Sequence, residues 1–519
     1  MQARHPIAAL GGIAVVMMLI ALDQTVVGTA LPQMVSDLQG FGLYPWVAAA
    51  FLLTNAIFIP VTGRLGDLYG RKPFLLAAIA LFTAASMLCG LAHSMLQLVL
   101  ARGLQGIGGG MLIGSAFASV SDLFPDTLER VRWQVVLSAS FGVASALGPV
   151  LGGVLTQHLG WRSVFYVNLP VGLVALPVVW RFLPWMVHHH DTPPRMDWGG
   201  VALLTVAVGT LQMATEMGEQ LGFASLSFWG LVAFSLAFWA GFVHHQRHTS
   251  GPVIPPQLFE SATVRLLAVL ATLTGLVMFV LIFYAPLLLQ GGFGLSPKEA
   301  GLLVTPLLVG ITIGSIVNGR LIQRMDHPQR LFSHGVVLLI VSILGLCVCG
   351  GSTPAWLIAS LFGLAGFSLG FQLPNLTLQM QSAVTRAHQG AASALIQTLR
   401  SLGSMFGASV AGLLVSLSFT RRVSHSLPLP NAADSAVAAL LKTPQILVRA
   451  ADQTALRNAG QQSGLDVNAL LDQAREGLVW GIREALLACV AVAVINYFLG
   501  RKLPPFVKRA IDTAPANAD

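Results

Sequence analysis

Apolar residues are grouped along this chain into long runs, which charged residues, glycines and prolines separate. Most runs reach the length of about 20 residues that an α-helix needs to cross the hydrocarbon core of a bilayer. We therefore predict an all-α polytopic membrane protein with fourteen transmembrane helices. The predicted spans are 7–31, 46–65, 74–92, 96–119, 133–156, 162–183, 198–216, 225–244, 264–290, 300–319, 332–350, 355–379, 391–418 and 478–499.

Positive charges flank these spans unevenly. If the N-terminus is cytoplasmic, most basic residues outside the spans fall in cytoplasmic segments, and the short outside loops hold only Arg162 and Lys298. Such an excess is typical of cytoplasmic loops. One missed or extra span would invert the bias in everything after it, so we predict an even count with both termini in the cytoplasm. No Ala-x-Ala-like site follows the first apolar run, so we expect no cleavable signal.

The long connection 419–477 is the exception to the charge bias. It would lie outside and yet carries several basic residues, which long loops tolerate. Apolar residues recur within it at helical spacing. We therefore expect short amphipathic helices there, lying on the outer surface.

The two halves of the chain share a weak internal repeat. The segment "GRLGDLYGRKP" at 63–73 follows the second span, and "NGRLIQRMDHP" at 318–328 holds the matching place in the second half. Transporters built from repeats bind substrate near the midplane, between two halves that move against each other. The predicted units are a six-helix bundle at 1–183, a linker with two extra transmembrane helices at 184–263, a second six-helix bundle at 264–500 that includes the 419–477 loop, and a cytoplasmic tail at 501–519.

Composition supports the membrane class and excludes several others. Apolar residues make up 55% and charged residues 10% of the chain, against roughly 25% charged residues in soluble domains, and the mean hydropathy is +0.74. The net charge of +8 suits an anionic membrane surface rather than nucleic acid. No metal-ligand spacing or catalytic cluster occurs, so we expect no metal, no cofactor and no enzyme activity. The cysteines, which we interpret as small core residues, are Cys89, Cys347, Cys349 and Cys489.

A few charged residues lie within the apolar spans. Asp23 is the one acid placed well inside a span, while Arg102 and Arg400 are basic residues at similar depth. A charged side chain at the bilayer centre costs about 2.5–3.5 kcal/mol on insertion scales, so such groups face a cavity or pair with one another. Burial favours a neutral carboxyl group and a nearby arginine favours the ionised form, so the two together suit proton exchange near neutral pH. A fixed ion pair between Asp23 and Arg102 is the alternative. Glu216, near the outer end of the seventh span, can reach water and is the fourth candidate for proton coupling or substrate binding.

The fifth span carries a cluster of helix-disturbing and small residues. In "ASALGPVLGGVL", Pro149 removes a backbone donor and disturbs the helix. Gly148 and Gly152 form a small-xxx-small face, with Gly153 beside them, that lets a neighbouring helix approach closely. A kinked and closely packed helix suits a gating position, and plain helix packing is the alternative.

The turn at 63–73 combines charge and glycine. Gly63, Asp67, Gly70 and Arg71 lie in it, and Arg130 lies in the next cytoplasmic loop. A basic loop alone would not require Asp67, whereas a charge network that locks one conformation would. The alternative is a solvated basic turn.

These segments together resemble the major facilitator superfamily. "GRLGDLYGRKP" resembles its signature loop between helices two and three, "ARGLQGIGGG" its helix-four motif and "GVASALGPVLGG" the helix-five motif of its antiporters. "LDQTVVGTALP", "WRSVFYVNLPVG" and "LRSLGSMFG" are similar to the fourteen-helix drug:proton antiporter branch, the EmrB/QacA type. The resemblance implies the major facilitator fold, with two six-helix bundles and two extra central helices.

The resemblance also implies roles for individual residues. Asp23 would serve proton coupling or cation recognition, and Arg102 would serve proton transfer. Asp67 and Arg71 would belong to the conformational lock, and Gly148 with Pro149 to the antiporter helix. The helix-one motif usually has Asn where this chain has Gly28. If that amide contacts substrate in the family, we expect the substrate specificity of this chain to differ from the typical member.

We therefore expect a proton-coupled multidrug efflux antiporter that works by alternating access. Its substrates would be small amphipathic organic compounds, including lipophilic cations. A cavity with Arg102, Arg400 and one acid would equally suit neutral or anionic compounds. It would act as a monomer in the cytoplasmic (inner) membrane, driven by the proton gradient and in contact with lipid. A flippase or an exporter of a lipid or specific metabolite on the same fold is the alternative. A proton-coupled peptide importer is disfavoured because its Glu-x-x-Glu-Arg signature is absent from the first span.

Overall fold

The computed structural model describes most of the chain. The described residues are 6–38, 43–124, 126–185, 196–222, 225–249, 251–295, 297–325, 327–385, 389–426, 447, 454–458 and 467–505. They are predominantly helical and contain no β-strand. Most of the 419–477 segment, with its predicted amphipathic helices, lies outside these residues, and so does the tail beyond residue 505.

The described helices reproduce the predicted spans. They are α1 (Pro6–Leu38), α2 (Tyr44–Tyr69), α3 (Arg71–Gly90), α4 (Met95–Leu123), α5 (Thr127–Leu159), α6 (Ser163–Tyr166), α7 (Asn168–Phe182), α8 (Trp198–Leu221), α9 (Leu226–His248), α10 (Ala262–Leu287), α11 (Pro297–Arg324), α12 (Arg330–Val348), α13 (Ala355–Ser382), α14 (Gln389–Ser426) and α17 (Val467–Gly500).

Within the described part of the chain, twelve helices are long and apolar enough to cross a membrane, α6 and α7 together making one span. The two segments of α5, which meet at 40°, make a thirteenth. The fourteenth predicted span is α8, whose apolar stretch Trp198–Ala214 is shorter. The all-α, multi-pass architecture predicted from the apolar runs is confirmed.

Polar caps and glycines fix where several helices begin. Ser94 accepts a hydrogen bond from the amide of Gln97 at the start of α4, and Asp126 accepts one from Glu129 at the start of α5. Such caps satisfy amides that the first helical turn leaves unpaired. Gly70 separates α2 from α3 with a φ of 86°. This is the left-handed region that favours glycine, so the chain reverses there within one residue.

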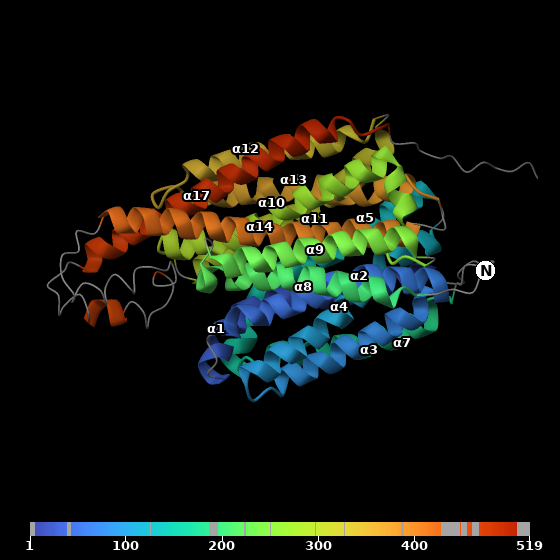
Figure 1. The fold of residues 1–519 in the computed structure, drawn as a ribbon, viewed down its shortest axis with the longest axis horizontal. Coiled ribbons are helices and arrows are strands. Elements are labelled where there is room, and N and C mark those ends of the chain that lie inside the picture. Colours follow the sequence, from blue (N-terminus) through green and yellow to red (C-terminus); the bar gives the residue numbers. More distant parts are fainter. Residues whose placement is uncertain are drawn as a thin grey trace, which may run out of the picture.

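The long helices run side by side and alternate in direction (Figure 1). We call the end with the turn between α2 and α3 the Gly70 end, and the opposite end, where α3 finishes, the Gly90 end. Because the number of spans is even, α1 begins and α17 finishes at the same end. Gly500 packs against Phe332 at the start of α12, which also lies at the Gly70 end.

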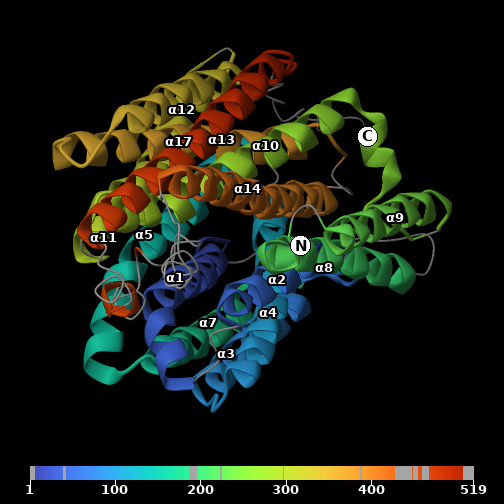
Figure 2. The same cartoon turned by 60° about the vertical axis from the view of Figure 1, so that its left-hand side comes forward.

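The helices form two bundles with a hairpin beside them (Figures 1 and 2). Helices α1–α7 share two apolar cores, and α10–α14 with α17 share two others. Helices α8 and α9 pack on each other, and α8 also packs on α2. A smaller apolar cluster joins this hairpin to both bundles, through Ile57 of α2, Leu204 of α8 and Leu402 of α14. The predicted fold of two bundles plus two extra helices is confirmed, and the unit boundaries at 183, 263 and 500 stay predictions.

The two bundles meet along two helix pairs. On one side α5 packs against α11, and on the other α14 packs against α2 and α4. Glycines permit close approach there, as at Gly63 beside Ala394 and Gly319 beside Val135. Both contacts lie at the Gly70 end, so the bundles are joined at that end.

Candidate functional site

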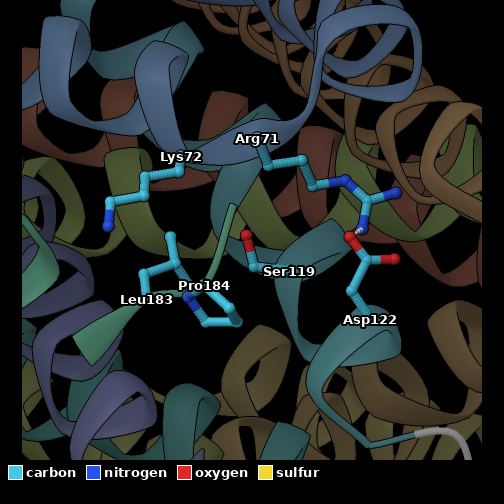
Figure 3. A pocket seen from close by; sticks show the side chains of 6 residues that line it. All are labelled: Arg71, Lys72, Ser119, Asp122, Leu183 and Pro184. Atoms are coloured by element: carbon cyan, nitrogen blue, oxygen red, sulfur yellow. Dashed lines mark ion pairs between the residues drawn. The ribbon is translucent and has the colours of Figure 1, made fainter. Parts of the chain in front are cut away.

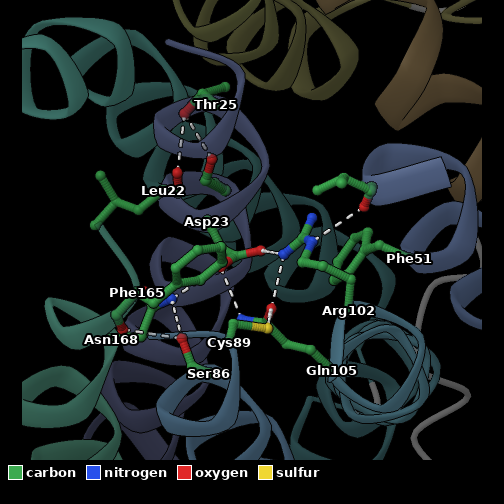
Figure 4. Close-up of polar contacts among 12 residues, drawn as sticks. Leu22, Asp23, Thr25, Phe51, Ser86, Cys89, Arg102, Gln105, Phe165 and Asn168 are labelled. Atoms are coloured by element: carbon green, nitrogen blue, oxygen red, sulfur yellow. Dashed lines mark hydrogen bonds and ion pairs between the residues drawn. The ribbon is translucent and has the colours of Figure 1, made fainter. Parts of the chain in front are cut away.

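Asp23 lies in the interior of the first bundle and pairs with Arg102. The side chains come from α1 and α4, and their exposed fractions are 1% for Asp23 and 3% for Arg102. Nη1 of Arg102 lies 2.6 Å from Oδ2 of Asp23 (Figure 4). The structure therefore brings together the two charges that stand out in the apolar spans, and the roles of coupling site and fixed ion pair both stay predictions.

Two amides complete the surroundings of the Asp23 carboxylate. Gln105 of α4 donates from Nε2 to Oδ1 at 2.8 Å, and Asn168 at the start of α7 donates from Nδ2 to the same oxygen at 2.9 Å. With Arg102, three donors from two helices converge on one carboxylate of a third. Hydrogen bonds to an ionised acceptor are about twice as strong as neutral ones. The arrangement thus holds the carboxylate in place and ties α1, α4 and α7 together.

Arg102 has several partners besides Asp23. Its Nη1 donates to Oε1 of Gln105 at 2.7 Å, and its Nε donates to the carbonyl of Val47 in α2 at 3.3 Å. Its guanidinium carbon lies 4.3 Å from the ring centroid of Phe51, which is cation–π distance. A buried ion pair is tolerated only when the remaining donors are also satisfied. Most of the Arg102 donors meet that condition.

A second layer of polar groups supports the amides. Asn168 also donates to Oγ of Ser86 at 3.0 Å, and Ser86 donates to the carbonyl of Phe165 at 2.9 Å. Cys89 lies 3.5 Å from Oε1 of Gln105. Oδ1 of Asn168 is buried without a hydrogen-bond partner among the described residues. This free acceptor would allow the hydrogen bonds of the layer to rearrange when the Asp23 carboxylate gains a proton.

Gln105, Asn168 and Ser86 were missed by reasoning from the sequence. Gln105 follows Arg102 by three residues and so lies on the same helical face. Asn168 is the amide inside "WRSVFYVNLPVG", at the junction of two apolar helices. A census of uncharged polar residues within the spans would have found both.

Glycines of α4 bring its polar residues close to α2. A Cβ at Gly106 would overlap the backbone of Phe51, and one at Gly110 would overlap the backbone of Asn55. This close approach lets Arg102 reach the carbonyl of Val47. The glycines of α4 therefore help to position the ion pair. Gly28 has no neighbour within 4 Å of an added Cβ, so the departure from the helix-one motif faces open space.

The antiporter motif of α5 contacts the helix that carries Asp23. A Cβ at Gly148 would overlap the side chain of Thr25 in α1. The two segments of α5, Arg132–Ser145 and Val150–Leu159, meet at 40°, which agrees with a kink at Pro149. Gly152 is buried, whereas Gly153 is exposed with nothing near an added Cβ. The close contact thus involves Gly148 and not Gly153.

A second buried charge network lies at the Gly70 end. Nη2 of Arg71 lies 2.8 Å from Oδ1 of Asp67, and Arg71 also pairs with Asp122 at the end of α4 (Figure 3). Arg71 donates in addition to the carbonyl of Ala118. Asp122 was not predicted as a member of this network. A Cβ at Gly390 of α14 would overlap both Asp67 and Arg71, so the network touches the second bundle.

The remaining members of the predicted lock lie close to this network in the fold. Gly63 packs against Ala394 of α14, and Arg130 is buried and donates to the carbonyl of Phe124 at 3.3 Å. A small cavity of about 10 Å³ lies beside Arg71. Pockets for drug-sized ligands have about 300–1,000 Å³, so this one is too small for such a compound. Its lining residues are Arg71, Lys72, Ser119, Asp122, Leu183 and Pro184 (Figure 3).

The other two candidates for coupling or substrate binding lie away from Asp23. Arg400 is half-buried in α14 of the second bundle. Glu216 lies in α8, and its side chain is outside the described part of the structure. Among the described residues, no group of His, Cys, Asp and Glu could hold a metal ion.

Comparisons with known proteins agree with the fold and the motifs. The family model of the Major Facilitator Superfamily matches residues 13–408 and 266–508. The multidrug transporter protein MdtP of Bacillus subtilis is 32% identical over 78% of this chain and 74% of its own length. Multidrug resistance protein 3 of Bacillus subtilis is 29% identical over 94% of each chain. The multidrug resistance protein Stp of Mycobacterium tuberculosis is 29% identical over 96% of this chain and 91% of its own.

Solved structures show the same fold at low sequence identity. The human organic anion transporter MFSD10 superposes with a TM-score of 0.63 at 15% identity, covering 95% of this chain and 99% of its own. The proton:xylose symporter XylE superposes with a TM-score of 0.58 at 13% identity, covering 96% of each chain. On the fold, the motifs and the family match, this chain belongs to the Major Facilitator Superfamily and is a multi-pass membrane transporter rather than an enzyme.

Proposed function

We propose that this transporter is a proton-coupled antiporter that exports small amphipathic organic compounds. Its relatives are named multidrug transporters or multidrug resistance proteins, which supports the export of drugs. The observation that carries the proposal is the Asp23 site. A single carboxylate deep in the first bundle is held by Arg102, Gln105 and Asn168. A group that can gain a proton there changes the net charge of a buried cluster, which is what coupling to a proton gradient requires.

Protonation of Asp23 would loosen the contacts between α1 and its neighbours. The neutral carboxyl group no longer balances the charge of Arg102, and the hydrogen bonds from Gln105 and Asn168 weaken. The proton and the substrate would then favour different conformations of the cluster. Binding of one would therefore promote release of the other.

The path from Asp23 to the second bundle runs through α5. Thr25, two residues after Asp23, contacts Gly148 of α5, and Gly142 of α5 contacts Thr312 of α11. A shift of α1 therefore bears on the helix that meets the other bundle. This contiguous packing supports coupling between the proton site and alternating access.

The orientation and surroundings follow from the charge bias of the loops. We propose a cytoplasmic membrane location with both termini in the cytoplasm, which makes the Gly70 end cytoplasmic. The contacts of Gly63 and Gly390 with the other bundle would then close the cytoplasmic side. We further propose that the transporter acts as a monomer and uses the proton gradient without a cofactor.

The substrate preference for lipophilic cations stays a prediction from the resemblance. Asp23 is paired with Arg102, so a cation can use this carboxylate only after Arg102 moves. A flippase, or an exporter of a lipid or specific metabolite, is the second candidate. It would use the same fold and would not need a titrating Asp23.

Dye efflux from proteoliposomes with an imposed pH gradient tests the proposal. We expect gradient-driven transport by the wild type and a loss of at least about ten-fold for Asp23→Asn, because the variant cannot exchange the proton. Asp472→Asn is the matched control, since Asp472 is exposed and pairs only at the surface with Arg475. Transport that persists without a gradient, and is unchanged in Asp23→Asn, would exclude the antiporter and favour the flippase.

A further inference from the structure

Arg400 differs from the other deep arginines because no carboxylate balances it. Arg102 and Arg71 each pair with an aspartate, whereas Arg400 has no ion pair among the described residues. It lies eleven residues into α14, about 16 Å along the helix at 1.5 Å per residue. The position is too deep for the guanidinium to sit at the helix end.

The helices around Arg400 offer no spare acid. Helix α14 contains no Asp or Glu, and neither do α10 and α13, which pack against it. Helices α2 and α4 carry one acid each, Asp67 and Asp122, and both pair with Arg71. Helix α17 packs along α14, but its last acid, Glu484, lies three residues after Gly481, which contacts Val415 about four turns from Arg400. Helix α8 meets α14 where Leu204 lies near Leu402, and its first acid, Glu216, lies about three turns beyond Leu204. Among the described residues, therefore, no carboxylate is left to balance the positive charge of Arg400.

Gln397 is a second unsatisfied polar group on the same face of α14. Its exposed fraction is 2%, and neither Oε1 nor Nε2 has a hydrogen-bond partner among the described residues. It precedes Arg400 by three residues, so the two side chains are neighbours on the helix surface. A buried amide with both atoms unpaired is costly. Such a group is expected where a ligand completes the hydrogen bonds.

The other faces of α14 are occupied by packing. Gly403 and Gly407 lie against the backbone of α10. Leu402 and Met405 pack with α2 and with the α8–α9 hairpin. Successive residues of an α-helix are rotated by about 100°. Gln397 and Arg400 therefore lie on the side of α14 that is between α10 and α2 and is turned away from the α8–α9 hairpin. That side faces the interior between the two bundles, where such transporters hold substrate.

We propose that Arg400 and Gln397 bind the carboxylate of the transported compound. This inference rests on the proposed export function and names its substrate class: amphipathic organic carboxylates, zwitterions included. The guanidinium presents paired N–H donors that match the two oxygens of a carboxylate. The Gln397 amide, one turn away, adds a further donor. The acidic group of the substrate supplies the negative charge that the surrounding helices lack.

Two dyes that differ only at the carboxyl group test the inference. Rhodamine 110 has a free carboxylate, and rhodamine 123 is its methyl ester. Binding is measured by fluorescence polarisation on the full-length purified protein in detergent, without a gradient. The wild type is expected to bind rhodamine 110 about ten-fold or more tightly than rhodamine 123. Arg400→Gln should abolish this preference and change the affinity for rhodamine 123 by less than about two-fold.

Two further variants separate binding from folding. Arg400→Lys keeps the charge and loses the paired donors, so it should retain an intermediate preference for rhodamine 110. Gln397→Ala should lower the preference by about three-fold. Intact binding of rhodamine 123 shows that each variant is folded. If Arg400→Gln does not fold, Arg400→Lys and Gln397→Ala decide the question.

The outcomes distinguish this inference from the proposed function. It is overturned if the wild type binds rhodamine 110 no more tightly than the ester, or if the folded variants keep the full preference. Gradient-driven efflux would still stand in that case. Conversely, a clear preference for rhodamine 110 together with efflux that ignores the gradient would retain the carboxylate site and remove the antiport mechanism.

Discussion

Two buried arginine–aspartate pairs of the first bundle invite comparison. The pair of Arg102 and Asp23 lies entirely inside that bundle, and amides of Gln105 and Asn168 complete it. The network of Arg71 with its aspartates lies at the Gly70 end, where Gly390 of the second bundle touches it. Both are ion pairs with little exposure to solvent. They differ in whether the second bundle contacts the charged side chains.

This difference teaches that burial of an ion pair does not by itself assign its role. The Asp23 cluster can change its charge while its contacts remain within one bundle. The Arg71 network can change only if the contact with α14 also changes, because Gly390 fits against it without a side chain. The first arrangement suits a proton site, and the second suits a lock between conformations.

The largest effect is expected from separating the charges of the Asp23 pair. Asp23→Asn or Arg102→Gln leaves a buried partner without its counter-charge, which costs about 3–5 kcal/mol in buried pairs. The double variant removes both charges and should lose less stability than the sum of the single variants. Thermal unfolding of the purified protein measures this cycle. Additive losses would show that the pair does not act as a unit.

The next effect concerns the contact between Arg71 and the second bundle. Gly390→Ala places a methyl group against Asp67 and Arg71, and overpacking of this kind costs about 1–3 kcal/mol. This cost destabilises the conformation in which the bundles are joined at the Gly70 end, so the opened conformation becomes more populated. In a background without the four native cysteines, maleimide labelling of Ser393→Cys, which is buried beside this contact, should therefore accelerate. Gly301→Ala is the control, because nothing lies within 4 Å of its Cβ, and equal labelling rates in both would contradict the prediction.

A similar pair of glycines tests the link between Asp23 and α5. Gly148→Ala should lower gradient-driven transport several-fold, because its methyl group would overlap Thr25 and displace α5 from α1. Gly153→Ala, five residues later on the same helix, meets nothing within 4 Å and should transport like the wild type. Transport assays on both variants, at matched amounts of folded protein, decide the matter. Loss in both would indicate a helix-propensity effect instead.

The smallest effect is expected from a neutral contact between the bundles. Gln134 of α5 donates to Oε1 of Gln381 in α13 at 2.9 Å, and both are buried. Gln134→Leu should destabilise the joined state by about 0.5–1.5 kcal/mol, the net value of one hydrogen bond. The same maleimide assay should then show acceleration smaller than that of Gly390→Ala. If Gln134→Leu accelerates labelling as much as Gly390→Ala does, the amide pair, and not the Arg71 network, is the main contact that holds the joined state.

Local features of the chain were sufficient to predict much of the fold. The long apolar runs predicted the spans, and the glycine and proline cluster predicted a disturbed α5, which bends by 40° there. Asp23 and Arg102 were singled out because each is a charge in an apolar run. These features could be found because the cost of placing a charge or a proline in a membrane helix depends on the local sequence.

Uncharged partners of the site were not found in the same way. Gln105, Asn168 and Ser86 cost less to bury than charges do, so the apolar pattern does not single them out. Asp122 lies at a helix end and resembles many solvated acids in sequence. Its pairing with Arg71 depends on how α3 and α4 are placed.

By itself, then, the sequence determined the class of the protein, the number of spans and the depth of the critical charges. These follow from hydropathy and helix geometry along one segment at a time. Only the tertiary structure decided which charges are satisfied. Asp23 meets donors from 79 and 145 positions away in the chain, whereas Arg400 meets no carboxylate among the described residues. That distinction depends on which helices the fold places side by side, and hydropathy along the chain carries no record of it.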